Sequence, residues 1–220
     1  HAIKDYTDMA AHLEAVPGAR AVVNFAPLLL EQIEDYAKQV EGFLTNSLAI
    51  RDPVLAALIS PALPPSEEQR IMLIKACVRA NETRMIGRFP AYHRLAEMAV
   101  WFTAHPESQR YLSNQYLADL LVWYHLAWLG ETVRRNDARI KHLLEKESGY
   151  SLHDRRELLS VIGELLSKVI PRYRQLAARG YFVQVPHPAV REPLSMPGAP
   201  YRLAATPWRL RGPAPVAGQD

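Results

Sequence analysis

Cysteine is almost absent from this chain, and its scarcity excludes two ways of stabilising a small domain. The single Cys77 cannot form an internal disulfide and cannot build a cysteine-rich zinc site. It lies within the apolar stretch 71–78, so we expect a buried small side chain there rather than a nucleophile. The eight histidines include no pair at the i, i+3 or i, i+4 spacing of a helical metal site, and we expect no metal and no cofactor.

Long apolar runs and an excess of one charge are also missing. No stretch approaches the roughly 20 residues of a membrane-spanning helix, and no secretory signal peptide is visible, so we expect a cytoplasmic protein without a membrane partner. Lys and Arg number 26 against 23 Asp and Glu. Acids follow the basic pairs Arg134-Arg135 and Arg155-Arg156 within two residues, which favours solvated helix faces over phosphate contacts. We therefore expect no nucleic-acid partner.

Helical periodicity dominates what the chain does contain. Apolar spacing and helix-start signals predict helices over about 3–15, 27–42, a short segment after Pro53, 66–86, 91–103, 113–128, 137–147 and 151–180. Ser66, Ser113 and Ser151 are the expected caps. Strands are predicted only over 21–25 and 182–185. Because a buried strand needs partners that this chain hardly supplies, we interpret it as an α-rich piece of a larger α/β domain.

The most distinctive cluster of side chains is the segment Asp119-Leu-Leu-Val-Trp123-Tyr-His125-Leu-Ala-Trp128. Flat aromatic rings complement the C–H faces of a pyranose, but aromatic rings also fill helical cores. Trp128 falls on the apolar stripe of its helix and is assigned to the core. Trp123 falls off that stripe, so it is the candidate for a sugar contact, with a core position as the alternative.

Two histidines are further substrate-binding candidates. His1 lies at the mouth of the first helix, either as polar lining of a site or as an ordinary neighbour of the helix cap. His187 follows the second strand, at the kind of strand-to-loop edge where barrel sites form, or else in a plain loop. No catalytic residue is assigned, because the acids occupy polar helix positions and no Gly-x-Ser-x-Gly or Cys/His pair is present.

Several segments together resemble glycoside hydrolase family 57. They are residues 1–10, 23–36, 81–92, 119–128 and 170–180, and they follow the family's order over about residues 1–188. The resemblance implies an α-glucan-active, retaining enzyme whose catalytic domain is a (β/α)7 barrel with helical insertions. It assigns 1–65 to a βα unit and connecting segment, 66–180 to the helical insertion, and 181–220 to a last strand and a Pro/Arg-rich disordered tail.

This chain departs from the family pattern in ways that bear on activity. The family's His-Gln-Pro motif would precede His1, and Val183 stands where a Glu is expected before His187. The family's nucleophilic Glu and acidic Asp would lie beyond this chain. We therefore expect a truncated member with a partial (β/α)7-type barrel, inactive alone, that binds α-glucan or maltooligosaccharide once the barrel is completed. The alternative is a non-catalytic helical binding or interaction module.

Overall fold

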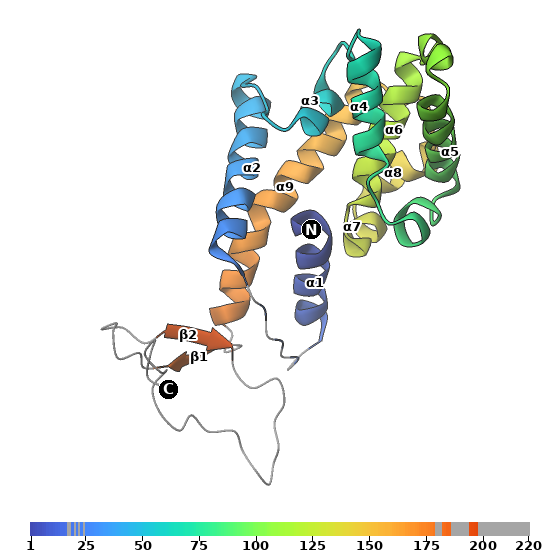
Figure 1. Cartoon of the computed structure of the whole chain (residues 1–220). Helices are drawn as coiled ribbons and strands as arrows, with labels where there is room; N and C mark the ends of the chain where they lie inside the picture. The colour runs from blue at the N-terminus through green and yellow to red at the C-terminus, as the bar shows by residue number, and fades with distance from the viewer. Residues whose placement is uncertain are drawn as a thin grey trace, which may run out of the picture.

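Helices make up most of the computed structural model (Figure 1). The structure describes residues 1–16, 19, 21, 23 and 25–178, together with the backbone of 182–185 and 194–197. In chain order the helices are the π-helical turn Ala2–Tyr6, α1 (Thr7–Ala15), α2 (Pro27–Asn46), α3 (Pro53–Ile59), α4 (Glu67–Cys77), the π-helical turn Glu82–Ile86, α5 (Pro90–Ala104), the 3-10 turn Pro106–Tyr111, α6 (Asn114–Ala127), α7 (Glu131–Asn136), α8 (Ala138–Lys146) and α9 (Leu152–Leu176).

Local sequence signals set most of the helix starts. Ser66, Ser113 and Ser151 each accept a hydrogen bond from a first-turn amide, as predicted, and Ser151 and Asp154 complete a reciprocal capping box. Proline occupies the first positions of α2, α3 and α5, where its missing N–H costs nothing. The predicted helix over 66–86 is wrong in its continuity: α4 ends at Cys77, whose carbonyl accepts from Tyr92 Oη at 2.6 Å, and Glu82–Ile86 forms a separate π-helical turn.

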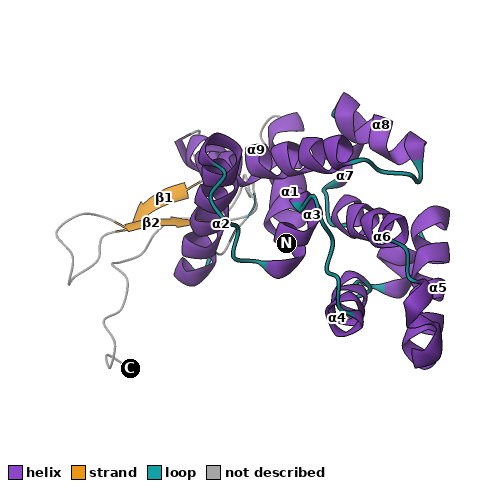
Figure 2. Ribbon diagram, turned by 90° about the horizontal axis from the view of Figure 1, so that it is seen from above, coloured by secondary structure: helices purple, strands orange, loops and turns teal. Residues whose placement is uncertain are grey.

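Helices α6 and α9 organise the core. Helix α6 is apolar on nearly every side, so it requires cover from all directions, and α3, α4 and α5 pack against it. Helix α9 runs alongside α2 and also packs against α1, α3 and α8. Figure 2 shows the N-terminus amid these helices. No helix in the described part of the chain is both long and apolar enough to cross a membrane.

The two described strands form an antiparallel pair and not a barrel. Strand β1 (Phe182–Val185) lies where the sequence predicted it, and it pairs with β2 (Leu194–Pro197) in a register that sets Phe182 opposite Pro197. A (β/α)7-type barrel needs a closed set of parallel strands. The prediction of a partial barrel is therefore wrong for the described residues. Strand β2 lies within the segment 181–220 for which a disordered tail was expected, and apart from β1 and β2 that segment lies outside the described residues.

The predicted strand over 21–25 is also wrong where it is described. Ala21, Val23 and Phe25 belong to no strand. Val23 is buried, and the Phe25 ring stacks on Tyr6 at 4.9 Å and meets Tyr173 edge-on at 4.8 Å. Apolar and aromatic residues suit any half-buried surface, so Phe25 packs against side chains of helical segments instead of a sheet.

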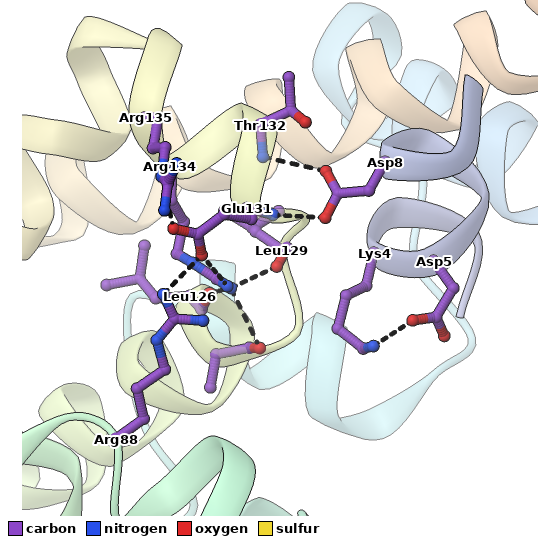
Figure 3. A network of polar contacts seen from close by, with 11 residues as sticks. Lys4, Asp5, Asp8, Arg88, Leu126, Leu129, Glu131, Thr132, Arg134 and Arg135 are labelled. Atoms are coloured by element: carbon purple, nitrogen blue, oxygen red, sulfur yellow. Dashed lines mark hydrogen bonds and ion pairs between the residues drawn. The ribbon is translucent and has the colours of Figure 1, made fainter. Parts of the chain in front are cut away.

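The N-terminal helix is attached to α7 by a cap that comes from a distant part of the sequence. Figure 3 shows Asp8 accepting from the amides of Glu131 at 2.6 Å and Thr132 at 2.9 Å. A carboxylate at a helix N-terminus satisfies free N–H groups and favours the helix dipole. An added Cβ at Gly130 would lie 2.5 Å from Asp8 Oδ1, so a larger residue would displace this carboxylate from the amides that it caps. The first turn is thereby held against the bundle.

Arg155 is buried, which contradicts the predicted solvated face. Its guanidinium donates to the carbonyls of Ala57 at 3.4 Å, Leu58 at 3.2 Å and Ser60 at 3.1 Å, at the C-terminal end of α3. Burial lowers the pKa of Arg155, and the neighbouring charge of Arg156 lowers it further. Arg134 is a second basic residue turned inward, toward the carbonyls that end α6. Each pair thus contains one arginine turned inward, buried Arg155 and half-buried Arg134, and one exposed arginine.

We predict that Arg155→Met destabilises the protein far more than Arg156→Met. The first change leaves the terminal carbonyls of α3 without donors, at a cost of about 1–3 kcal/mol for each buried group left unpaired. The second removes an exposed charge and should alter the free energy of unfolding by about 0.5 kcal/mol or less. Urea unfolding followed by circular dichroism measures both, and equal losses would contradict the assigned role of Arg155.

We further predict that acid weakens the fold through Asp154. Burial opposes ionisation of this carboxyl, but hydrogen bonds from Lys146 and Ser151 outweigh it and lower its pKa to about 2. A depressed folded-state pKa contributes stability above the unfolded value of 3.8, and that stability is lost as pH falls toward 2. Urea unfolding at pH 5, 4, 3 and 2 should therefore show a shallower fall for Asp154→Asn than for wild type. The exposed-site control Glu41→Gln should keep the wild-type slope.

Candidate functional site

A pocket of about 350 Å³ lies where the first turn, α2, α3, α6 and α9 meet, and we call it the Trp128 pocket. Its size is at the lower end of the range of about 300–1,000 Å³ typical of ligand sites. It combines apolar walls with several polar groups. The lining residues are His1, Ala2, Ile3, Tyr36, Asp52, Val54, Leu55, Tyr124, His125, Trp128, Ile162 and Leu166.

One wall carries a hydroxyl–carboxylate pair. Tyr36 Oη, on α2, donates to Asp52 Oδ2 at 2.9 Å, and Asp52 Oδ1 accepts from the amides of Val54 and Leu55. Asp52 is thus the N-cap of α3, and this role fixes its position. Burial and the hydrogen bond to Asp52 raise the pKa of Tyr36 to about 12, so the phenol stays protonated near neutral pH. Its oxygen keeps lone pairs that can accept from a ligand.

His125 supplies a neutral ring to the lining of the pocket. The side chain is buried, and its Nδ1 lies 2.7 Å from the carbonyl oxygen of Leu121 in the same helix. A carbonyl only accepts, so Nδ1 carries the hydrogen of this bond. Burial lowers the pKa of His125, with the Leu121 carbonyl and Asp52 opposing it. In the neutral ring Nε2 then holds a lone pair and acts as a hydrogen-bond acceptor.

Trp128 closes α6 and gives the pocket its aromatic wall. Its ring meets His1 edge-on at 5.6 Å and Tyr124 at 6.4 Å. The indole Nε1 is buried and has no hydrogen-bond partner among the described residues. Buried tryptophan N–H groups normally find a partner, and an unpaired one costs about 1–3 kcal/mol.

His1 lines the pocket, which is one of the two positions that the sequence suggested for it. It is the residue before the first turn, but its side chain makes no capping bond. The imidazole is 73% exposed, lines the pocket and lies 2.7 Å from Asp5 Oδ2. It therefore provides a polar edge where the pocket meets solvent.

The structure reverses the roles that the sequence predicted for the two tryptophans, one in the core and one at a binding site. Trp123 is only 3% exposed, its Nε1 donates to the carbonyl of Glu147 at 2.8 Å, and its ring packs on Phe89. A ring enclosed in this way has no free face for a sugar, so the sugar role of Trp123 is wrong and the core alternative holds. Trp128, assigned to the core, instead lines the pocket. His187 lies outside the described residues.

Sequence reasoning missed Tyr36, Asp52 and His125 as functional residues. Asp52 could have been found, because an acid directly before Pro53 is a helix-start signal. His125 belonged to the aromatic segment already singled out, but nothing local indicated which of its rings would turn toward a pocket. The pairing of Tyr36 with Asp52 spans 16 positions, so only the three-dimensional structure reveals it.

The residues lining the Trp128 pocket suit binding better than chemistry. They include one carboxylate, Asp52, and both its oxygens already accept hydrogen bonds. Within the described residues no group of three His, Cys, Asp or Glu side chains is arranged to hold a metal ion. A second pocket, of about 830 Å³, lies between α2, α3 and α4, and its lining is mostly apolar with Arg156 as its charged member.

Comparison with known proteins adds no relative: no family model, no curated protein and no solved structure matches this chain.

We predict that Trp123→Ala costs more stability than Trp128→Ala. Truncating a fully buried aromatic residue costs about 3–5 kcal/mol, because it leaves a cavity. The Trp128 ring is only partly enclosed, so its removal should cost less. Chemical denaturation of the two variants compares their free energies of unfolding. A larger loss at Trp128 would restore the sequence-based assignment of the two rings.

Proposed function

We propose that this chain binds α-glucan segments such as maltooligosaccharides in the Trp128 pocket, without cleaving them, as a piece of an α-glucan-active retaining glycoside hydrolase or glucanotransferase. The observation that carries the proposal is the combination in one pocket of aromatic rings and hydroxyl-binding groups. Trp128 and Tyr124 offer apolar ring surface, while Tyr36, Asp52 and His1 offer donors and acceptors. This is the mixture that a pyranose, with apolar C–H faces and a rim of hydroxyls, requires.

The charge of the pocket supports a neutral ligand. Asp52 is its one carboxylate, and the Tyr36 phenol and two α3 amides already share that negative charge. Neither a strongly anionic nor a strongly cationic ligand finds an unpaired opposite charge in this lining. The α-glucan class itself rests on the resemblance of segments 1–10, 23–36 and 119–128 to family 57, and parts of these three segments border the pocket.

Binding without hydrolysis follows from the single carboxylate. Retaining glycoside hydrolysis uses two carboxyl groups about 5–5.5 Å apart, one as acid and base and one as nucleophile. Asp52 has no second lining carboxylate beside it. Incubation of the chain with maltoheptaose should therefore release no reducing sugar above the level of a buffer control. Release that survives Asp52→Asn would place a catalytic site elsewhere in this chain.

Isothermal titration calorimetry tests the binding directly. Maltotriose and maltoheptaose should bind wild type, and cellotriose should bind more weakly if the site is shaped for an α-glucan. Trp128→Ala should weaken maltotriose by about tenfold or more, because about 1.4 kcal/mol of lost aromatic contact corresponds to that factor. Trp101→Ala is the matched control, since Trp101 is half exposed on α5 and lies outside the lining.

Each result bears on a different part of the proposal. Equal binding of cellotriose and maltotriose would overturn the α-glucan assignment and leave a general saccharide site. Equal weakening by Trp128→Ala and Trp101→Ala would place the saccharide outside the Trp128 pocket. No heat with any saccharide at millimolar concentration would overturn the function.

A non-catalytic helical binding module for an apolar partner is the second candidate. The observation favouring it is the larger pocket between α2, α3 and α4, whose lining includes Phe43, Met72 and Leu73. The same calorimetry separates the two candidates, because an apolar module should give no response to maltotriose.

A further inference from the structure

The larger pocket between α2, α3 and α4 has a wall that is mostly hydrocarbon, and we call it the Arg156 pocket. Its volume of about 830 Å³ lies in the upper part of the range of about 300–1,000 Å³ typical of ligand sites. Phe43 and Met72 are among the apolar side chains that line it. Prolines contribute as well, at positions 61 and 64, and they have no N–H to donate to a ligand.

Several backbone carbonyls of this lining already have hydrogen-bond partners. The carbonyls of Ala57 and Ser60 accept from Arg155 at 3.4 and 3.1 Å. The carbonyl of Ala62 accepts from Ser60 Oγ at 2.6 Å. A polyol loses hydrogen bonds to water when it enters such a wall, whereas a hydrocarbon chain has none to lose. The pocket therefore suits an alkyl chain better than a saccharide.

Arg156 is the charged member of this lining. It is exposed on α9, and no described residue forms a hydrogen bond or an ion pair with its guanidinium. The guanidinium of Arg155 is bonded to two lining residues, Ala57 and Ser60, so a second positive charge lies close to the wall. No carboxylate is present among the described lining residues. This end of the pocket is therefore electropositive, and it lacks a counter-charge.

We propose that the Arg156 pocket binds a free single-chain carboxylate, such as a medium-chain fatty acid, with its carboxylate on Arg156 and its alkyl chain against Phe43, Met72 and Leu73. A guanidinium donates two parallel hydrogen bonds to a carboxylate, which gives this head group a geometric match. Met72 is 57% exposed, and its flexible thioether adapts to an alkyl chain. A neutral alcohol lacks the charge, and an alkylammonium meets a like charge.

This site is separate from the Trp128 pocket, so the inference does not rest on saccharide binding. Val54 of α3 borders both pockets, and their described linings differ at every other position. The two ligands also differ in kind, since one is a neutral polyol and the other an apolar anion. A saturating concentration of maltotriose should therefore leave the affinity for the carboxylate unchanged.

The head group is tested by calorimetry with decanoate, decan-1-ol and decyltrimethylammonium. Wild type should bind decanoate at least about tenfold more tightly than either of the others. Arg156→Gln should weaken decanoate by about tenfold, because a charge-assisted hydrogen bond is lost, and should leave decan-1-ol unchanged. The matched control is Arg84→Gln, since Arg84 is an exposed arginine outside the lining. It should keep the wild-type affinity for decanoate.

The alkyl chain is tested with a charge placed on the apolar wall. Met72→Glu should weaken both decanoate and decan-1-ol, and decanoate more, because the new carboxylate repels it. Met98→Glu is the control, since Met98 is 45% exposed on α5 and lies outside the lining. Thermal unfolding checks that each variant is folded, which the exposure of all four positions favours.

Each contrary result overturns the inference at a defined point. If decanoate gives no heat with wild type, there is no such site. If decanoate and decan-1-ol bind equally, or if Arg84→Gln weakens decanoate as much as Arg156→Gln does, the head-group contact is wrong. Equal losses in Met72→Glu and Met98→Glu would place the chain outside this pocket. Displacement of decanoate by maltotriose would contradict two separate sites. The first three results leave saccharide binding in the Trp128 pocket unaffected.

Discussion

The short helix α3 is held at both ends, and the shape of the Trp128 pocket depends on that double attachment. At its C-terminal end the buried Arg155 of α9 donates to three carbonyls, of Ala57, Leu58 and Ser60. At its N-terminal end Asp52 caps the first amides and receives the hydroxyl of Tyr36 from α2. A helix of seven residues is too short to be stable by itself, so these partners determine where it lies.

This arrangement connects the core to the site through a short series of contacts. Helix α9 carries Arg155, and the hydrogen bonds of Arg155 fix the position of α3. Helix α3 in turn holds its cap Asp52 against Tyr36. On the other side, α6 is enclosed by its neighbours and ends at Trp128, where the indole and the ring of His125 border the pocket. Asp8 caps α7, and this contact attaches the first helical turn to the other helices and keeps His1 near the pocket. Residues far apart in sequence thus supply each wall.

The sequence predicted the features that depend on neighbouring residues. Ser113 and Ser151 mark the starts of α6 and α9 because capping needs only an oxygen and the next turn of amides. The segment 182–185 was found as a strand, although its antiparallel partner was not. The features that failed depend on distant contacts. Phe25 packs against the helical residues Tyr6 and Tyr173 instead of a sheet, and Arg155 is buried where it donates to the carbonyls at the end of α3.

The exchange of Trp123 and Trp128 shows the same limit at the candidate site. Helical spacing orders side chains around one axis, but it does not say which face meets other helices and which meets a pocket. Trp123 is enclosed because Phe89 and the Glu147 carbonyl lie against it, and both come from other segments. Trp128 borders the pocket because α6 ends there. The saccharide contact proposed for this segment is therefore assigned to Trp128 instead of Trp123.

Fluorine NMR of the protein labelled with 5-fluorotryptophan tests the central claim most directly, because the chain contains only four tryptophans. Trp→Phe variants assign each resonance, and maltotriose is then titrated into the labelled wild-type protein. Saccharide binding in the pocket should move the resonance of Trp128 in a saturable way and leave those of Trp123 and Trp101 in place. A saturable shift confined to Trp101, or no shift at any tryptophan, would contradict a saccharide site at the Trp128 pocket.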